Sequence, residues 1–178
     1  LRFPFWDTAL HTINGFLCAA IGFSLVTLLN DNEKVVFRLS PVFMADVAVS
    51  FSMTIGVVWE FFEFGMDITF KTDMQKDRIV HEISSVILNP DGENKPVVID
   101  HIVGTTIYYI EDGQSKELSI VDGYLDIGLR DTMKDLFVNF IGAVVFSILG
   151  LLYIKDRDEY KFTEKFIPKL KAKITNQK

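Results

Sequence analysis

Three stretches of the chain are apolar enough and long enough to be membrane-spanning helices. Residues 8–30, between Asp7 and Asp31, contain no Asp, Glu, Lys or Arg. Residues 41–64 form a second stretch, which three carboxylates interrupt, and residues 136–154 form a third without any charge. Because about 20 apolar residues cross a hydrocarbon core as an α-helix, each stretch can span a bilayer. A secretory signal is the alternative for the first stretch, but it would be shorter and would begin with basic residues.

Basic residues near the ends of these stretches predict their direction. Residues 155–178 hold eight Lys or Arg against four Asp or Glu, and Lys34 and Arg38 lie between the first two stretches. Residues 68–130 hold six basic and eleven acidic residues. Since loops rich in Lys and Arg stay in the cytoplasm, the acidic segment should lie outside and the C-terminus inside. The sequence thus predicts a multi-pass membrane protein with a cytoplasmic C-terminus.

The acidic segment itself carries signals of β-structure. Residues 97–99, 102–110 and 118–121 are rich in β-branched and aromatic side chains, and Asp112-Gly113 between the last two runs is a hairpin signal. Residues 89–92, with the sequence Asn-Pro-Asp-Gly, mark another turn, and residues 83–88 supply a third candidate strand. A cap this small has a thin core, so we expect it to rest on the membrane helices or on a partner.

These patterns predict an α-helical integral membrane bundle of three transmembrane helices with a small extracytoplasmic β-rich insert. The expected layout is residues 1–67 for the first two helices, 68–130 for the insert, 131–155 for the third helix and 156–178 for a basic cytoplasmic tail. In the tail, hydrophobic residues recur every four positions among lysines, which suits either a helix on an anionic leaflet or a solvated tail that fixes topology. They are Phe162, Phe166, Leu170 and Ile174.

The composition of the chain argues against nucleic-acid binding and against structures built on several cysteines. The chain has 178 residues, of which 49% are hydrophobic, and a net charge of -6, whereas a nucleic-acid-binding protein needs a basic face. One cysteine, Cys18, excludes an internal disulfide framework and a zinc site made of several thiolates. The expected partners are membrane lipids and, because three helices scarcely enclose a polar cluster, a second copy of the chain or other membrane helices.

Ionisable residues gather at the ends of the three stretches that would share the outer leaflet. They are Asp7 and His11; Glu60, Glu63 and Asp67; and Asp131, Asp135 and Asn139. Within each set the spacing places the side chains on one helix face. A charge within a bilayer costs about 3 kcal/mol on insertion scales, so something should neutralise these carboxylates. Four arrangements would neutralise or solvate them: protons shared between carboxyl groups, Lys134 and Arg130 as counter-ions, a bound cation, or exposure to water at the interface.

Carboxylates together with an imidazole are suitable ligands for a hard or borderline divalent cation. The expected metal ligands are Glu60, Glu63, Asp67, Asp131 and Asp135. The expected catalytic residues are His11, Glu60, Glu63 and Asp135, with His11 as the acid or base. A divalent metal ion is therefore the one cofactor that the sequence suggests, since it has no Gly-rich phosphate loop, nucleophile elbow or His-Glu-x-x-His motif.

Three motifs in order resemble the VanZ-like/YjdF-like group of small bacterial polytopic membrane proteins, in particular an uncharacterised Gram-positive subgroup. They are Asp-x-x-x-His-x-x-x-Gly from Asp7, Trp-Glu-x-x-Glu from Trp59, and Asp-x-x-x-Asp-x-x-x-Asn-x-x-Gly from Asp131, preceded by Gly-Tyr-Leu-Asp-Ile-Gly-Leu at residues 123–129. The resemblance covers all three stretches, although the insert is longer than the group's usual connection. It implies a polytopic inner-membrane protein of largely undefined activity, and further helices ahead of Leu1.

Three functions fit these features. The first is an accessory, envelope-associated membrane protein of undefined activity that acts through its outer cap. The alternative is a metal-dependent membrane enzyme that acts on a lipid-linked or phosphorylated headgroup. A cation or proton pathway is the third, but its charges would line a whole crossing rather than gather at one leaflet. The sequence favours the accessory protein, because it offers no identifiable nucleophile or set of phosphate-binding arginines.

Overall fold

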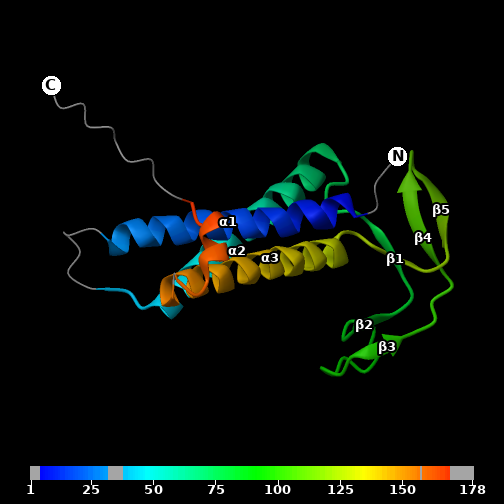
Figure 1. Cartoon of the computed structure of the whole chain (residues 1–178). Coiled ribbons are helices and arrows are strands. Elements are labelled where there is room, and N and C mark those ends of the chain that lie inside the picture. The colour runs from blue at the N-terminus through cyan, green and yellow to red at the C-terminus, as the bar shows by residue number, and fades with distance from the viewer. Residues whose placement is uncertain (1–4, 32–37, 157, 169–178) are drawn as a thin grey trace. The chain divides into compact units, whose positions relative to one another are not determined.

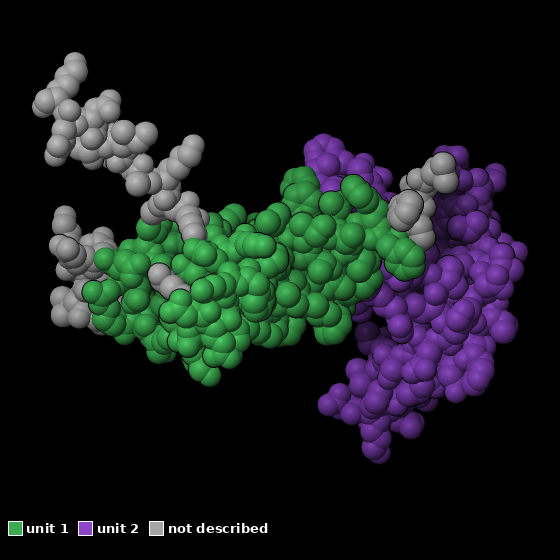
Figure 2. All heavy atoms as spheres, in the orientation of Figure 1, with its two compact units in different colours: residues 1–63, 133–178 green, residues 64–132 purple. Residues whose placement is uncertain are grey.

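The computed structural model describes residues 5–31, 38–156 and 158–168, and the chain within them forms two compact units (Figures 1 and 2). The first unit comprises residues 1–63 and 133–178, and the second comprises residues 64–132. Lys34, Leu170 and Ile174, used above to predict direction and a tail helix, lie outside the described residues.

The predicted three long apolar helices are present. They are α1 (Trp6–Asn30), α2 (Pro41–Phe70) and α3 (Leu129–Lys155), and each is long and apolar enough to cross a membrane (Figure 1). Two of them extend past the predicted apolar stretches, because α2 continues beyond Phe64 and α3 begins seven residues before Leu136. The polar residues flanking those stretches are therefore helical.

Side chains in the helical unit are arranged with small and polar residues inside and large apolar residues outside. The buried positions of the three helices include Gly15, Ala19, Ser52, Asn139 and Ser147. The exposed positions are mostly Leu, Ile and Phe; they include Leu17, Ile21, Val58, Phe61, Phe137 and Ile148. In lipid, helices associate through small residues at close contacts while apolar side chains face the acyl chains, so this distribution suits a bilayer.

All three helices meet at Gly15, Ser52 and Asn139, which we call the three-helix contact. The Ser52 hydroxyl of α2 donates a hydrogen bond to the Gly15 carbonyl of α1 at 2.8 Å. A Cβ atom on Gly15 would clash with the backbone carbonyl of Asn139 on α3, so only glycine allows these two backbones to approach so closely. The Asn139 amide lies 3.5 Å from the Ser52 carbonyl, which brings α3 against α2 as well.

Aromatic packing fills the bundle further along the helices. Phe146 of α3 makes edge-to-face contacts with Phe16 and Phe23 of α1, with ring centroids 5.1 and 5.8 Å apart. After α3, a short 3-10 helix, η1 (Lys161–Lys165), brings Phe166 edge-on against Phe16 at 6.1 Å. The described part of the tail thus packs against the helices instead of forming the continuous amphipathic helix that was one of two expectations.

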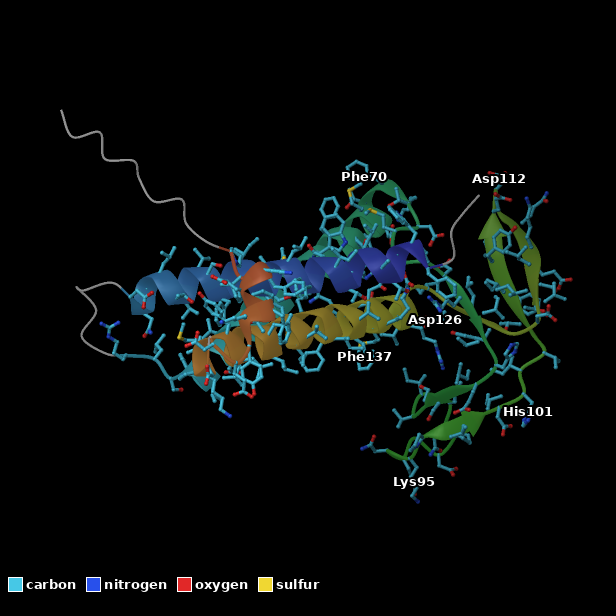
Figure 3. The ribbon with its side chains drawn as sticks, in the orientation of Figure 1. Phe70, Lys95, His101, Asp112, Asp126 and Phe137 are labelled. Atoms are coloured by element: carbon cyan, nitrogen blue, oxygen red, sulfur yellow. The ribbon has the colours of Figure 1, made fainter. Side chains whose placement is uncertain are left out.

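The second unit contains three separate pairs of antiparallel strands (Figure 1). β1 (Arg78–Val80) pairs with β6 (Tyr124–Asp126), β2 (Ile83–Ser85) pairs with β3 (Val97–Ile99), and β4 (Gly104–Glu111) pairs with β5 (Gln114–Val121). The predicted hairpin is confirmed: Asp112 and Gly113 form its turn with φ of 53° and 75°, the left-handed values of a type I′ turn. Figure 3 labels Asp112 at this turn and Lys95 in the β2–β3 connection.

The remaining strands differ in part from the sequence expectation. The turn at residues 89–92 is present, with the Gly92 amide donating to the Asn89 carbonyl, and residues 83–85 do form a strand. The apolar run 102–110 begins its strand only at Gly104, since the chain turns at His101 with a φ of 54°. β1 and β6 were not predicted, because three-residue strands carry too little alternation to be recognised.

We expect Gly142→Ala to destabilise the helical unit. A Cβ atom at Gly142 would clash with the backbone carbonyl of Thr12, so α1 and α3 would have to separate, at a cost of about 1–3 kcal/mol. Thermal unfolding of the detergent-purified protein measures this loss. Gly65→Ala is the matched control, because a Cβ there meets no atom within 4 Å and should be neutral or slightly stabilising. Equal midpoints for the two variants would contradict the close approach.

Candidate functional site

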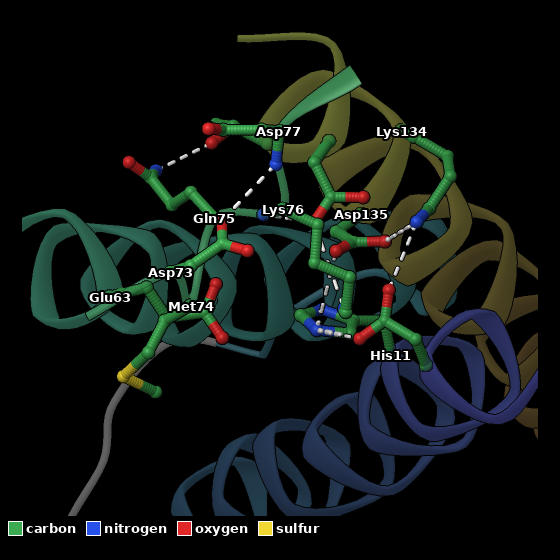
Figure 4. Close-up of polar contacts among 12 residues, drawn as sticks. His11, Glu63, Asp73, Met74, Gln75, Lys76, Asp77, Lys134 and Asp135 are labelled. Carbon is green, nitrogen blue, oxygen red and sulfur yellow. Dashed lines mark hydrogen bonds and ion pairs between the residues drawn. The ribbon is translucent and has the colours of Figure 1, made fainter. Parts of the chain in front are cut away.

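Three ionisable side chains from two helices converge within the helical unit. His11 of α1 lies with its Nε2 atom 3.8 Å from Asp7 Oδ1 and 3.6 Å from Asp135 Oδ2 of α3 (Figure 4). One ligand atom from each residue lies within 4.8 Å of the others. We call Asp7, His11 and Asp135 the carboxylate–histidine cluster. Asp7 and His11 share a face of α1 because they are one helical turn apart.

Lys134 supplies a positive charge to this cluster. Its Nζ atom lies 3.0 Å from Asp7 Oδ2 and 3.0 Å from Asp135 Oδ1 (Figure 4). Asp135 is only 1% exposed, whereas His11, Asp7 and Lys134 are partly exposed. An ammonium group bridging two carboxylates offsets much of the cost of burying Asp135, since a buried charge needs a partner.

Glu60 and Glu63 of α2 are also buried, and Glu63 belongs to the surroundings of the cluster. Glu63 lies close enough to Glu60, His11 and Asp135 to interact with them electrostatically. The indole Nε1 of Trp59 donates a hydrogen bond to Glu63 Oε1 at 2.9 Å, which fixes that carboxylate. A cavity of about 320 Å³ is lined by polar and apolar groups of α1 and α2; they are Asp7, Leu10, His11, Asn14, Trp59 and Glu63.

The other two expected ligands, Asp67 and Asp131, belong to the second unit and are bonded there. Asp67 accepts hydrogen bonds from the Met74 and Gln75 amides at 2.7 and 2.8 Å, so it fastens the turn after α2. Asp131, which is 1% exposed, pairs with the Arg78 guanidinium at 3.0 Å and accepts from the backbone amide of Lys76. Both carboxylates therefore hold the insert's own chain in place.

The residues that form the cluster differ in part from those expected from the sequence. Of the expected residues, the structure brings His11, Asp135 and Glu63 together, and it adds Asp7 as a ligand-type group. The i, i+4 spacing of Asp7 and His11 was the signal for that addition. Sequence reasoning missed the pairing of Arg78 with Asp131, because these residues are far apart in the chain and no local pattern links them.

Chemically, the cluster offers one imidazole nitrogen and two carboxylate oxygens. This donor set suits borderline or hard divalent cations such as Zn²⁺, Mn²⁺ or Mg²⁺, and three protein ligands leave coordination positions open for water or substrate. The Lys134 ammonium group already pairs with Asp7 and Asp135, so a metal ion would compete with it for these carboxylates. The residues present are thus compatible with an ion without requiring one.

Long apolar helices with buried ionisable groups define a polytopic helical membrane protein. Residues 1–156 match the family model described as predicted membrane protein (DUF2238), and the chain belongs to this family of unknown function. No curated protein and no solved structure matches the chain.

We expect Asp131→Asn to destabilise the second unit by about 1–3 kcal/mol, because the change removes the buried negative charge that Arg78 and Lys76 face. Asp112→Asn is the matched control, since Asp112 is exposed at the β4–β5 turn, where Asn is equally suitable. Hydrogen exchange at the β1 and β6 amides measures the local loss. If Asp131→Asn left the protection of those amides unchanged, the ion pair would not stabilise the second unit.

Proposed function

We propose that this membrane protein binds a divalent cation at the carboxylate–histidine cluster and uses it on a lipid-linked or phosphorylated headgroup. The observation that carries the proposal is the convergence of three ligand atoms, from Asp7, His11 and Asp135, within 4.8 Å. One of these residues, Asp135, is almost fully buried, so its position is fixed by packing. Preorganised ligands of this kind lower the cost of assembling a metal site.

The charge balance around the cluster supports this proposal. Asp7, Glu60, Glu63 and Asp135 are four carboxylates in the helical unit, and Lys134 lies 3.0 Å from two of them, Asp7 and Asp135. Charges removed from water are costly unless they are paired, and like charges in proximity raise that cost. A divalent cation would be attracted to this concentration of carboxylates.

The cavity beside the cluster provides room for a substrate group. Its volume of about 320 Å³ lies at the low end of typical ligand pockets. A metal ion there would act as a Lewis acid toward a phosphoryl or carbonyl oxygen. Glu63, oriented by Trp59, lines the same cavity and is the group we assign as general base, with the buried Glu60 close to it and with His11 and Asp135 as ligands.

Metal binding by the full chain tests this proposal. Calorimetric titration of the detergent-purified protein with Mn²⁺ and Zn²⁺ should show one site, and His11→Gln and Asp135→Asn should each weaken it at least about tenfold. Asp46→Asn is the matched control, since Asp46 is an exposed carboxylate of α2 outside the cluster. Absence of binding in the unmodified protein, or an equal loss in Asp46→Asn, would refute the site.

Lys134→Gln provides a second and opposite test. Removing the ammonium group takes away a cation that lies 3.0 Å from both Asp7 and Asp135, so Mn²⁺ should bind more tightly by about threefold to tenfold. At the same time the metal-free protein should lose thermal stability, and added Mn²⁺ should restore it. Weaker Mn²⁺ binding in Lys134→Gln would show that the lysine supports the site instead of competing for it.

A second candidate function is an accessory, envelope-associated role of the insert, and the β4–β5 hairpin favours it. Apolar side chains on this hairpin are strongly exposed, with Tyr108 at 73%, Ile110 at 77% and Val121 at 81%. Isolated two-stranded sheets are marginally stable in water, and open strand edges attract further strands. Contact with an envelope partner, with lipid or with a second copy of the chain would cover these groups.

This accessory role requires the insert to lie outside the cytoplasm, and we propose that orientation as well. The acidic insert would lie on the extracytoplasmic side of the bacterial inner membrane, with the C-terminus in the cytoplasm, as the basic residues indicate. The resemblance to VanZ-like/YjdF-like proteins is consistent with such an arrangement, and homo-oligomers or additional membrane helices would complete the enclosure of the carboxylate–histidine cluster.

Thiol labelling tests both the placement and the accessory role. In a Cys18→Ala background, Asp112→Cys at the hairpin turn should react with a membrane-impermeant maleimide added to intact cells. Ile110→Cys on the hairpin face should be protected in cells but reactive in the purified protein. An unreactive Asp112→Cys in cells would place the insert inside, and an equally reactive Ile110→Cys in both samples would contradict a covered hairpin.

A further inference from the structure

A second cavity lies in the insert and is rich in positive charge. Its volume is about 370 Å³, and its charged and polar lining consists of Arg78, His81, Glu82 and Arg130. These residues come from β1, from the chain directly after it, and from the first turn of α3. We call this cavity the arginine pocket. It is separate from the residues of the carboxylate–histidine cluster and independent of the function proposed above.

Pairing of β1 with β6 brings the two arginines to one cavity. Arg78 is opposite Asp126 in the antiparallel register, and the Asp126 carboxylate accepts a hydrogen bond from the Arg130 amide at 2.9 Å. Asp126 thus fastens the beginning of α3 to the end of β6. The side chain of Arg130 takes no part in that bond, so its guanidinium is available to the cavity.

Asp131 holds Arg78 in position without using all of its donors. One nitrogen, Nη2, lies 3.0 Å from Asp131 Oδ1, while a guanidinium has five N–H donors in a planar fork. The Arg78 side chain is 45% exposed, whereas Asp131 is buried beneath it. A buried carboxylate that orients a partly exposed guanidinium is typical of a preorganised anion site, although the same ion pair alone would also serve stability.

Basic side chains are concentrated around the arginine pocket, although the segment as a whole is acidic. Residues 68–130 contain six basic and eleven acidic residues, yet three of the six gather here: Lys76, Arg78 and Arg130. Three carboxylates lie near them: the buried Asp131, the pocket-lining Glu82, and Asp126, which is opposite Arg78 in the β1–β6 register. His81 is fixed by its Nδ1 atom, which donates to the Ile102 carbonyl at 3.1 Å, so Nε2 remains for a ligand.

We propose that the arginine pocket binds a phosphate group on a hydroxylated organic moiety. Two guanidinium groups provide the paired N–H forks that match phosphate oxygens, and phosphate carries enough charge to use both. Glu82 then accepts a hydrogen bond from a hydroxyl of the attached moiety and disfavours ligands with additional carboxylates. A glycerol phosphate headgroup of a lipid and a free sugar or glycerol phosphate share this chemistry.

Direct binding measurements distinguish the two sources. In the soluble arm, glycerol 3-phosphate and inorganic phosphate are titrated into the full chain in an uncharged detergent. In the lipid arm, native mass spectrometry counts phosphatidic acid and phosphatidylglycerol retained from nanodiscs that also contain phosphatidylcholine. Binding in the first arm alone indicates a free phosphate ester, binding in the second indicates a lipid headgroup, and binding in neither overturns the proposal.

Arg130→Gln is the decisive variant, because its side chain makes no bond that the fold needs and its backbone amide still meets Asp126. We expect it to weaken the observed binding at least about tenfold, and Arg130→Lys to recover only part of it because the fork is lost. Lys95→Gln, at an exposed position in the same unit, is the matched control for net charge. An equal loss in Lys95→Gln, or no loss in Arg130→Gln, would refute the pocket. Binding unaltered by His11→Gln would confirm its independence from the metal site.

Discussion

Close approach of three helix backbones at Gly15, Ser52 and Asn139 is the constraint on which the helical unit depends. Gly15 is the residue that permits this approach, and the Ser52 hydroxyl holds α2 to the same carbonyl. His11 lies one turn before Gly15, and Asp135 lies one turn before Asn139. The contact therefore sets the register at which their side chains meet. The carboxylate–histidine cluster depends on this backbone packing, and a change in the packing of α1 against α3 would alter the distance between Asp135 and the pair Asp7 and His11.

The charges of the carboxylate–histidine cluster impose a second constraint. A buried carboxylate such as Asp135 needs a positive partner, and the chain places Lys134 directly beside it in sequence and in space. An ammonium on a flexible stem can leave, which a fixed guanidinium could not do as easily. Within the structure, Lys134 balances part of the charge of Asp7 and Asp135. By contrast, Asp131 and Asp67 are engaged by backbone amides and have become structural parts of the insert.

Much of the fold could be predicted from the sequence, for identifiable physical reasons. Apolar stretches of helical length are a strong signal, and the Asp112-Gly113 turn between β-rich runs is another, so the helices and the main hairpin could be predicted. The spacing of Asp7 and His11 made their proximity foreseeable. Contacts between segments distant in the chain were not, because Arg78 meets Asp131 only after β1 pairs with β6, and three-residue strands leave no periodic trace. The arginine pocket was missed for this reason.

Unequal helix lengths have a consequence for how the protein would respond to its lipid. With 30 residues, α2 is about 45 Å long, whereas a typical hydrocarbon core is about 30 Å thick. The excess must be taken up by tilt or by projecting ends. Because α2 is held to its neighbours near its middle at Ser52, a change of tilt displaces its ends most, and Glu60 and Glu63 lie toward one end. Bilayer thickness would thereby adjust the spacing between these glutamates of α2 and His11 of α1, so the geometry around the histidine would depend on the surrounding lipid.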